Sequence, residues 1–187
     1  MERITHDHYP TPTWCIELAL KHIRLPAGRW LEPAAGHGQI VQAVNAVRND
    51  IVWAAWDIRP ETFYDLYFAV GDRAQVGDAL ELFKTCDDYD VVMTNPPYVL
   101  AHQFVMASLG VAEHVLMLLR LSFLASARRQ EFIDSTRPDV WVLPQRPKFR
   151  SDTAGTDVHD YAWFHWHPGS LGTVRVLPVV PLAARRF

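Results

Sequence analysis

Four consecutive residues, Asn95-Pro96-Pro97-Tyr98, could together grip a planar amino group. They follow the short apolar run 91–93, which predicts a buried strand that stops at a rigid, extended loop, because each proline fixes its own backbone and biases the preceding residue away from helix. The amide of Asn95 and the carbonyls beside the prolines could accept both hydrogens of an NH2 group while the ring of Tyr98 stacks on its plane. The simpler alternative is a strand that ends in a proline turn.

A turn of small residues, Pro33 to Gly38, follows the predicted strand 29–32, which ends in Glu32. It leads into an amphipathic segment, 39–47, that predicts a helix. Glycines let the backbone approach a ligand closely at a helix N-terminus. The third glycine of a full dinucleotide-binding fingerprint is absent, because Val41 occupies its place, so a tight turn without a ligand is an alternative interpretation.

Acids follow the next two predicted strands. Asp57, about twenty residues after the glycine turn, is placed to accept hydrogen bonds from ribose hydroxyls, and Ile58 could lie against an adenine ring. NAD enzymes share this acid, so it indicates an adenosine-containing cofactor without naming it. The triplet Gly77-Asp78-Ala79 after the third strand is, taken alone, a common turn.

The elements that must position these residues alternate between strand and helix along the chain, which indicates βαβ units and a doubly wound sheet. The run Val115 to Leu119 is typical of a central parallel strand. Thr11 is the expected N-cap, and Pro12 the first residue, of a helix whose apolar face is Ile16, Ala19, Leu20 and Ile23. The other expected helices are 61–70 (partial), 101–111 and 126–135, and the other expected strands are 51–56, 75–80, 140–143, 161–166 and a further edge strand, 173–179.

Composition sets limits on the class of protein. With 187 residues and 49% hydrophobic content, the chain suits one domain, residues 1–187. The first ten residues lack an apolar leader, no run reaches membrane-spanning length, and Cys15 and Cys86 have no metal or disulfide spacing. We therefore expect a cytoplasmic protein with free thiols and no membrane partner. His165 and His167 alternate on one strand, but no third ligand follows at metal spacing, so we expect no metal.

The motifs, in this order from Tyr9 to Trp166, resemble those of class I S-adenosylmethionine-dependent methyltransferases, and in particular the small, phage-like DNA adenine N6-methyltransferases of the gamma type. The resemblance implies a Rossmann-like α/β fold with a mixed, mostly parallel seven-stranded sheet and helices on both faces. It implies S-adenosylmethionine as the cofactor. The implied cofactor-binding residues are Tyr9, Thr11, Pro12, Glu32, Pro33, Ala34, Gly36, Gly38, Asp57, Ile58, Asp78 and Ala79. The implied catalytic residues are Asn95, Pro96, Pro97 and Tyr98.

The activity implied is methyl transfer to the N6 amino group of adenine in DNA, with the base flipped out or already unpaired. Two alternatives stay open. The same motif could act on RNA adenine or on a protein glutamine amide, and the chain could be a non-catalytic module that keeps the cofactor pocket and docks nucleic acid. The recognition sequence and the oligomeric state, with a homodimer as one option, are also open.

A basic, proline-rich segment, residues 144–160, interrupts the predicted strands. In it Arg146, Lys148 and Arg150 surround Phe149, a mixture suited to phosphate contact and base stacking, although an ordinary exposed loop would look similar. Residues 1–119 carry 8 Lys/Arg against 15 Asp/Glu, and residues 120–187 carry 10 against 6. The basic excess is therefore C-terminal, and this insertion is the predicted contact with the nucleic-acid target.

Overall fold

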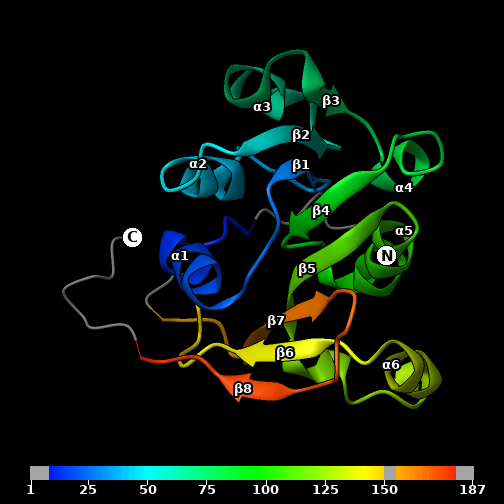
Figure 1. Cartoon of the computed structure of the whole chain (residues 1–187). Coiled ribbons are helices and arrows are strands. Elements are labelled where there is room, and N and C mark those ends of the chain that lie inside the picture. The colour runs from blue at the N-terminus through cyan, green and yellow to red at the C-terminus, as the bar shows by residue number, and fades with distance from the viewer. Residues whose placement is uncertain (1–8, 150–154, 180–187) are drawn as a thin grey trace, which may run out of the picture.

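All the strands among the described residues join in one mixed sheet (Figure 1). The computed structural model describes residues 9–149 and 155–179. The sheet has eight strands in the order β3-β2-β1-β4-β5-β7-β6-β8. Their bounds are β1 Gly28–Glu32, β2 Ile51–Asp57, β3 Ala74–Val76, β4 Tyr89–Thr94, β5 Ala112–Arg120, β6 Asp139–Val142, β7 Tyr161–Trp166 and β8 Val174–Val176. The first five strands in this order are mutually parallel, and β7 runs antiparallel to both β5 and β6.

The Rossmann-like α/β fold is confirmed, but the predicted number of seven strands is wrong. The eighth strand is β8, which pairs in parallel with β6 at the edge of the sheet and is exposed at all three positions. It is shorter than the expected strand 173–179, because Pro178 cannot donate to a ladder. The third strand is also shorter than predicted and ends at Val76, since Asp78 already caps the helix that follows.

Helices cover both faces of the sheet, as predicted (Figure 1). One face carries α1 Thr13–His22, α2 Gln39–Asn45 and α3 Phe63–Val70, and the other carries α4 Ala79–Leu82, α5 Ala101–Leu109 and α6 Gln130–Thr136. Short 3-10 turns lie at Pro60–Thr62, Gly71–Arg73, Tyr98–Leu100, Leu121–Phe123 and Ala127–Arg129. On β5, Leu116 and Leu118 enter one core while Val115, Met117 and Leu119 enter the other. Burial on both faces is the reason that this strand is continuously apolar.

The predicted start of the first helix is off by one residue. Pro12, not Thr11, is the N-cap of α1, its side chain makes no capping hydrogen bond, and Thr13 is the first helical residue. Proline suits this position because its carbonyl, which accepts from the backbone N–H of Cys15 at 2.9 Å, is the group the helix needs there. Thr11 is buried instead of capping the helix.

One buried hydrogen bond joins the helix α1 to the antiparallel strand β7. The indole N–H of Trp163 on β7 donates to the carbonyl oxygen of Cys15 at 3.0 Å, across 148 positions of sequence. This bond fixes the start of α1 against β7, and a second bond, from Asn95 Nδ2 to the carbonyl oxygen of Tyr9, ties the preceding segment to the end of β4. No helix among the described residues is long and apolar enough to cross a bilayer.

Three histidines from two strands and the loop after β7 gather beside Asp139. The rings of His165 and His167 stack with centroids 4.2 Å apart, and Nδ1 of His114 lies 3.1 Å from Nε2 of His165. His167 is anchored by Asp139, with Nε2 and Oδ2 3.0 Å apart. Among the described residues, no group of three or more His, Cys, Asp or Glu side chains could hold a metal ion.

Burial of His165 makes this cluster sensitive to acid. Its pKa falls from an ordinary 6.5 to about 3, first because the ring is buried and then because His167 and His114 lie beside it. The unfolded chain therefore binds this proton near pH 6.5, whereas the folded chain binds it only near pH 3. The contribution of neutral His165 to the free energy of unfolding is therefore fully present above pH 6.5 and is lost as the pH falls from 6.5 toward about 3.

We expect His165→Gln to make stability less dependent on acid. The drop in the free energy of unfolding between pH 7 and pH 5 should be smaller than in the wild type by about 2 kcal/mol, since the variant has no proton to bind there. Urea denaturation at the two pH values measures this difference. His22→Gln, outside the cluster, is the control. An unchanged acid dependence in His165→Gln would show that other groups set it.

Candidate active site

The predicted cofactor residues gather where parallel strands end. Glu32 closes β1, Asp57 closes β2, and Asp78 follows β3. The strands β1 and β2 pair in register Glu32 to Ala55, and β2 and β3 pair Asp57 to Val76, so these ends share one edge of the sheet. Open α/β sheets bind ligands at this edge. The structure therefore places the three acids together.

The glycine turn is bound to the end of β2. Gly36 and Gly38 have φ of 58° and 79°, in the left-handed region that residues with a Cβ seldom adopt. This conformation turns the backbone N–H of Gly36 to the Asp57 carboxylate, at 2.7 Å. Gly38 then serves as the N-cap of α2. The turn is fixed by its neighbours, with Pro33 buried and Ala34 half-buried just before it.

Glu32 is a buried acid with an unused oxygen. Its side chain is only 2% exposed, and Oε2 has no hydrogen-bond partner among the described residues. Burial raises the pKa of this carboxyl well above its usual range, the charge of Asp57 raises it further, and the backbone N–H of Val41 opposes the rise. A buried acceptor without a partner is costly, so this site favours a ligand that brings a cation or an N–H group to Glu32.

The Asp57 carboxylate already has partners within the protein. Oδ1 accepts from the backbone N–H and from Nε of Arg59 at 3.0 and 2.9 Å, and Oδ2 accepts from Gly36. Nη2 of Arg59 also donates a long bond of 3.4 Å to Oδ2, so a ribose at Asp57 would compete with the Arg59 side chain. The role predicted for Asp57 stays a prediction, and Arg59 is a neighbour that the sequence reasoning did not consider.

The other predicted adenosine contacts differ in exposure. Ile58 leaves 46% of its surface open beside Asp57. Asp78 caps α4, where Oδ1 accepts from the backbone N–H of Leu80 at 2.9 Å and the rest of the carboxylate is exposed. Ala79 is buried. An exposed aliphatic side chain and a free acceptor oxygen are compatible with contacts to a purine base, which stay predictions.

The Asn95 side chain is held at both ends. Its Nδ2 donates to the carbonyl oxygen of Tyr9 at 3.2 Å, and its Oδ1 accepts from the hydroxyl of Tyr98 at 2.9 Å. Pro96 is buried and Pro97 is exposed, so one side of the loop after β4 packs on the core and the other side faces solvent. These bonds fix the orientation of the amide, and the second lone pair of Oδ1 stays able to accept another donor.

The ring of Tyr98 belongs to an aromatic cluster that comprises Tyr9, Tyr98, Phe149 and Tyr161. Tyr98 lies 6.1 Å from Tyr9 and 5.5 Å from Tyr161, centroid to centroid. The guanidinium of Arg120, at the end of β5, lies over the Tyr98 ring, 4.6 Å from its centroid. Burial raises the pKa of the Tyr98 hydroxyl, which therefore stays protonated and able to donate to Asn95. Sequence reasoning missed Arg120, although its position at a strand end could have identified it.

The basic insertion differs from the prediction. Phe149 is only 4% exposed and packs edge-on against Tyr9 and Tyr161, so its burial does not fit the expected stacking on a base. Arg146 pairs with Asp160, with Nε and Oδ1 2.8 Å apart. Lys148 is half-buried, and Arg150 lies outside the described residues. The cations of this segment are thus less available than the sequence indicated.

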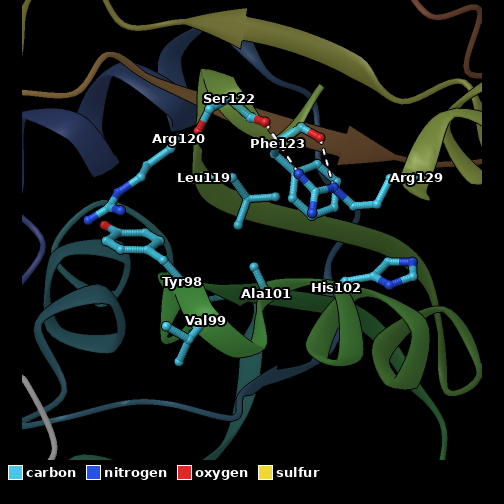
Figure 2. Close-up of a pocket in the computed structure, with 9 residues that line it drawn as sticks. All are labelled: Tyr98, Val99, Ala101, His102, Leu119, Arg120, Ser122, Phe123 and Arg129. Atoms are coloured by element: carbon cyan, nitrogen blue, oxygen red, sulfur yellow. Dashed lines mark hydrogen bonds between the residues drawn. The ribbon is translucent and has the colours of Figure 1, made fainter. Parts of the chain in front are cut away.

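Two cavities flank Arg120. The first, of about 190 Å³, opens between Tyr98 and Phe123 and is drawn in Figure 2. The second, of about 340 Å³, lies between Tyr9 and the segment 155–159. The Arg120 side chain lines both, so it separates the two hollows next to the Asn95 loop.

Among the comparisons with known proteins, the one with solved structures identifies the fold. No protein-family model matches the chain, and no curated protein matches it by sequence. Solved structures do match: a candidate RNA methyltransferase from Pyrococcus horikoshii has a TM-score of 0.66 at 13% identity, with 89% of this chain and 90% of that chain covered. The chain thus has the fold of class I S-adenosylmethionine-dependent methyltransferases.

Two other similar structures are described as different kinds of enzyme. The modification subunit of a candidate type I restriction enzyme from Vibrio vulnificus YJ016 matches with a TM-score of 0.62 at 14% identity, covering 98% of this chain and 49% of that one. The 23S rRNA methyltransferase ErmE matches with a TM-score of 0.62 at 14% identity, covering 95% and 74%. At such identities the likeness is one of fold.

Glu32 gives the sharpest test of cofactor binding. We expect Glu32→Gln to weaken the binding of S-adenosylmethionine by about tenfold to a hundredfold, because a charge-assisted hydrogen bond contributes roughly 1.5–3 kcal/mol. Isothermal titration calorimetry measures the affinity. Glu61→Gln, an exposed acid in the 3-10 turn before α3, is the control and should match the wild type. Equal affinities in all three proteins would exclude Glu32 from the cofactor site.

Proposed function

We propose that this protein transfers a methyl group from S-adenosylmethionine to the N6 amino group of adenine in DNA. The observation that carries the proposal is the fixed Asn95 amide, bonded to Tyr9 and Tyr98, at the end of β4. β4 pairs directly with β1, which brings the Asn95 loop beside the strand that ends in Glu32. An acceptor for an amine therefore lies next to the predicted cofactor site.

The residues at the end of β1 fit the cofactor. The unpartnered Oε2 of Glu32 would accept a hydrogen bond from the ammonium group of the cofactor's methionine part. The left-handed turn at Gly36 and Gly38 has no Cβ atoms at these positions, which would let the backbone approach the cofactor closely. When bound, the cofactor supplies an electrophilic methyl group on a sulfonium. Ile58 and Asp78 would contact its adenine, as the resemblance implies.

The chain's own contribution to the reaction is to hold the substrate amine. The lone pair of adenine N6 is delocalised into the ring, so the amine is a weak nucleophile. The Asn95 Oδ1 and the Pro96 carbonyl would accept its two hydrogens and draw the lone pair out of conjugation. Holding the amine at near-attack distance supplies much of the rate, and no covalent enzyme intermediate is needed.

The same geometry would serve adenine in RNA, which is the second candidate. Similar structures include both the modification subunit of a candidate type I restriction enzyme and an rRNA methyltransferase, at equal TM-scores of 0.62. Protein glutamine is less favoured, because the cation of Arg120 and the aromatic ring of Tyr161 lie beside Tyr98, and such groups suit a nucleotide. Assays with tritiated cofactor on DNA, RNA and protein separate these substrates.

In this proposal the chain, residues 1–187, acts as one catalytic domain. Phe149, from the insertion 144–160 that joins β6 to β7, contacts Tyr9 beside the site. Inside a duplex the adenine is stacked and paired, and the active site cannot reach its N6 group. The target adenine therefore has to be flipped out or unpaired before Asn95 can contact it.

We expect Asn95→Ala to lose nearly all methyl transfer and to leave cofactor affinity near that of the wild type. Removing a preorganised polar contact to the reacting group costs on the order of a hundredfold to a thousandfold in rate. Incorporation of tritiated methyl groups into DNA measures the rate, and calorimetry measures cofactor binding. Asn49→Ala, at an exposed position before β2, is the control. An active Asn95→Ala enzyme would refute the proposal.

Tyr98→Phe separates the hydroxyl of this residue from its ring. The variant loses the hydrogen bond to Asn95 Oδ1 but keeps the aromatic contacts, so kcat should fall about tenfold, in line with roughly 1–1.5 kcal/mol for one hydrogen bond. KM for DNA should stay unchanged. Tyr64→Phe, at a position 72% exposed, is the control. A raised KM with normal kcat would instead assign the hydroxyl to substrate binding.

A further inference from the structure

The pocket beside Tyr98 is positively charged and has no acid in its wall. Arg120 and Arg129 both line it, on either side of the apolar Leu119 and Ala101, and no Asp or Glu is among the lining residues (Figure 2). This contrasts with a chain that carries 21 acidic and 18 basic residues. The charge of the pocket therefore favours an anionic ligand.

We propose that this pocket binds the nucleic-acid phosphate next to the target adenine, held between Arg120 and Arg129. The proposal rests on the function proposed above and names a binding surface for its substrate. It assigns to these two arginines the contact that the sequence pattern placed on Arg146, Lys148 and Arg150.

Arg120 lies close to the reaction, and Asp157 lines the neighbouring cavity with it. It stacks on Tyr98 at 4.6 Å and its Nε donates a long bond of 3.4 Å to the Tyr161 hydroxyl, and no carboxylate within the described residues forms a salt bridge with it. Tyr98 in turn bonds Asn95. A phosphate bound by Arg120 would therefore lie close to Tyr98, whose hydroxyl bonds the Asn95 amide that holds the target amine. This is the place expected for the phosphate of the adjacent nucleotide.

Arg129 is held on the opposite wall. Its Nε and Nη2 donate to the carbonyl oxygens of Phe123 and Ser122 at 2.9 and 3.3 Å, and the guanidinium stacks on the Phe123 ring at 4.6 Å. These contacts fix the plane of the group and use only two of its five N–H donors. The remaining donors are available in the fork geometry that matches phosphate oxygens.

His102 adds an imidazole nitrogen to the same wall. Its Nε2 is buried and has no hydrogen-bond partner among the described residues, and the ring packs edge-on against Phe132 with centroids 5.0 Å apart. The basic insertion offers less, because Arg146 is already paired with Asp160 and Phe149 is buried.

The test is the salt dependence of DNA binding by the full-length chain. We would compare the wild type with Arg120→Gln, Arg129→Gln and the double variant, using a fluorescent adenine-containing oligonucleotide at several salt concentrations. The measured quantity is the slope of the logarithm of the binding constant against the logarithm of the salt concentration. Each lost phosphate contact should make this slope shallower by about 0.9 on duplex or 0.7 on single-stranded DNA, and the double variant should lose about twice as much. Arg120→Lys, which keeps the charge, should keep most of the slope.

Arg128→Gln is the matched control. Arg128 belongs to the same 3-10 turn as Arg129, is exposed, and does not line the pocket, so the same change of charge there should leave the slope as in the wild type. Calorimetric affinity for S-adenosylmethionine should be equal in all variants, which excludes misfolding as the cause. If Arg129→Gln does not fold, Arg120→Gln still decides the outcome, because its side chain makes only one long hydrogen bond.

The results distinguish this inference from the proposed function. If the wild type binds and methylates DNA while Arg120→Gln and Arg129→Gln keep its slope, the pocket is not the phosphate site and the function stands. If the wild type neither binds nor methylates DNA or RNA, both fail. Shallower slopes in these two variants, with Arg128→Gln unchanged, support the inference.

Discussion

The parallel pairing of β1 with β2 on one side and with β4 on the other is the constraint on which the site depends. Parallel strands end at the same edge, so this pairing alone places Glu32, Asp57 and Asn95 side by side, although Glu32 and Asn95 lie 63 positions apart. The pairing is stable only with both faces covered, which the two helical layers accomplish. The rest of the fold supports this edge.

The edge is electrostatically divided. On the side of β1, buried Glu32 has an oxygen without a partner, and its pKa is raised by burial. On the side of β5, Arg120 has no carboxylate in a salt bridge within the described part of the chain, and its charge lies over Tyr98. One half thus favours a cationic group and the other an anionic one. A near-neutral total charge conceals this division, because it averages over the whole surface.

The aromatic cluster explains how distant segments support the Asn95 loop. Tyr9 precedes α1 and Tyr161 begins β7, yet both rings pack against that of Tyr98. Phe149, after β6, packs in turn against Tyr9 and Tyr161. Such packing restricts Tyr98 and, through its hydroxyl, the amide of Asn95. Phe149 is therefore part of the support of the loop, and the basic insertion is attached to the site through its one buried aromatic residue.

The sequence by itself determined the fold class and the residues at the strand ends. Alternating apolar segments, the turn at Gly36 and Gly38 and the prolines after Asn95 are local signals, each read within about ten residues. The sequence did not determine the eighth strand, the partners of Asp57, the burial of Phe149 or the position of Arg120 over Tyr98. Only the tertiary structure decided these, because short edge strands, ion pairs and burial depend on which distant segments meet. A basic residue looks the same in sequence whether it pairs with an acid, as Arg146 does, or lies over an aromatic ring at the wall of a pocket, as Arg120 does.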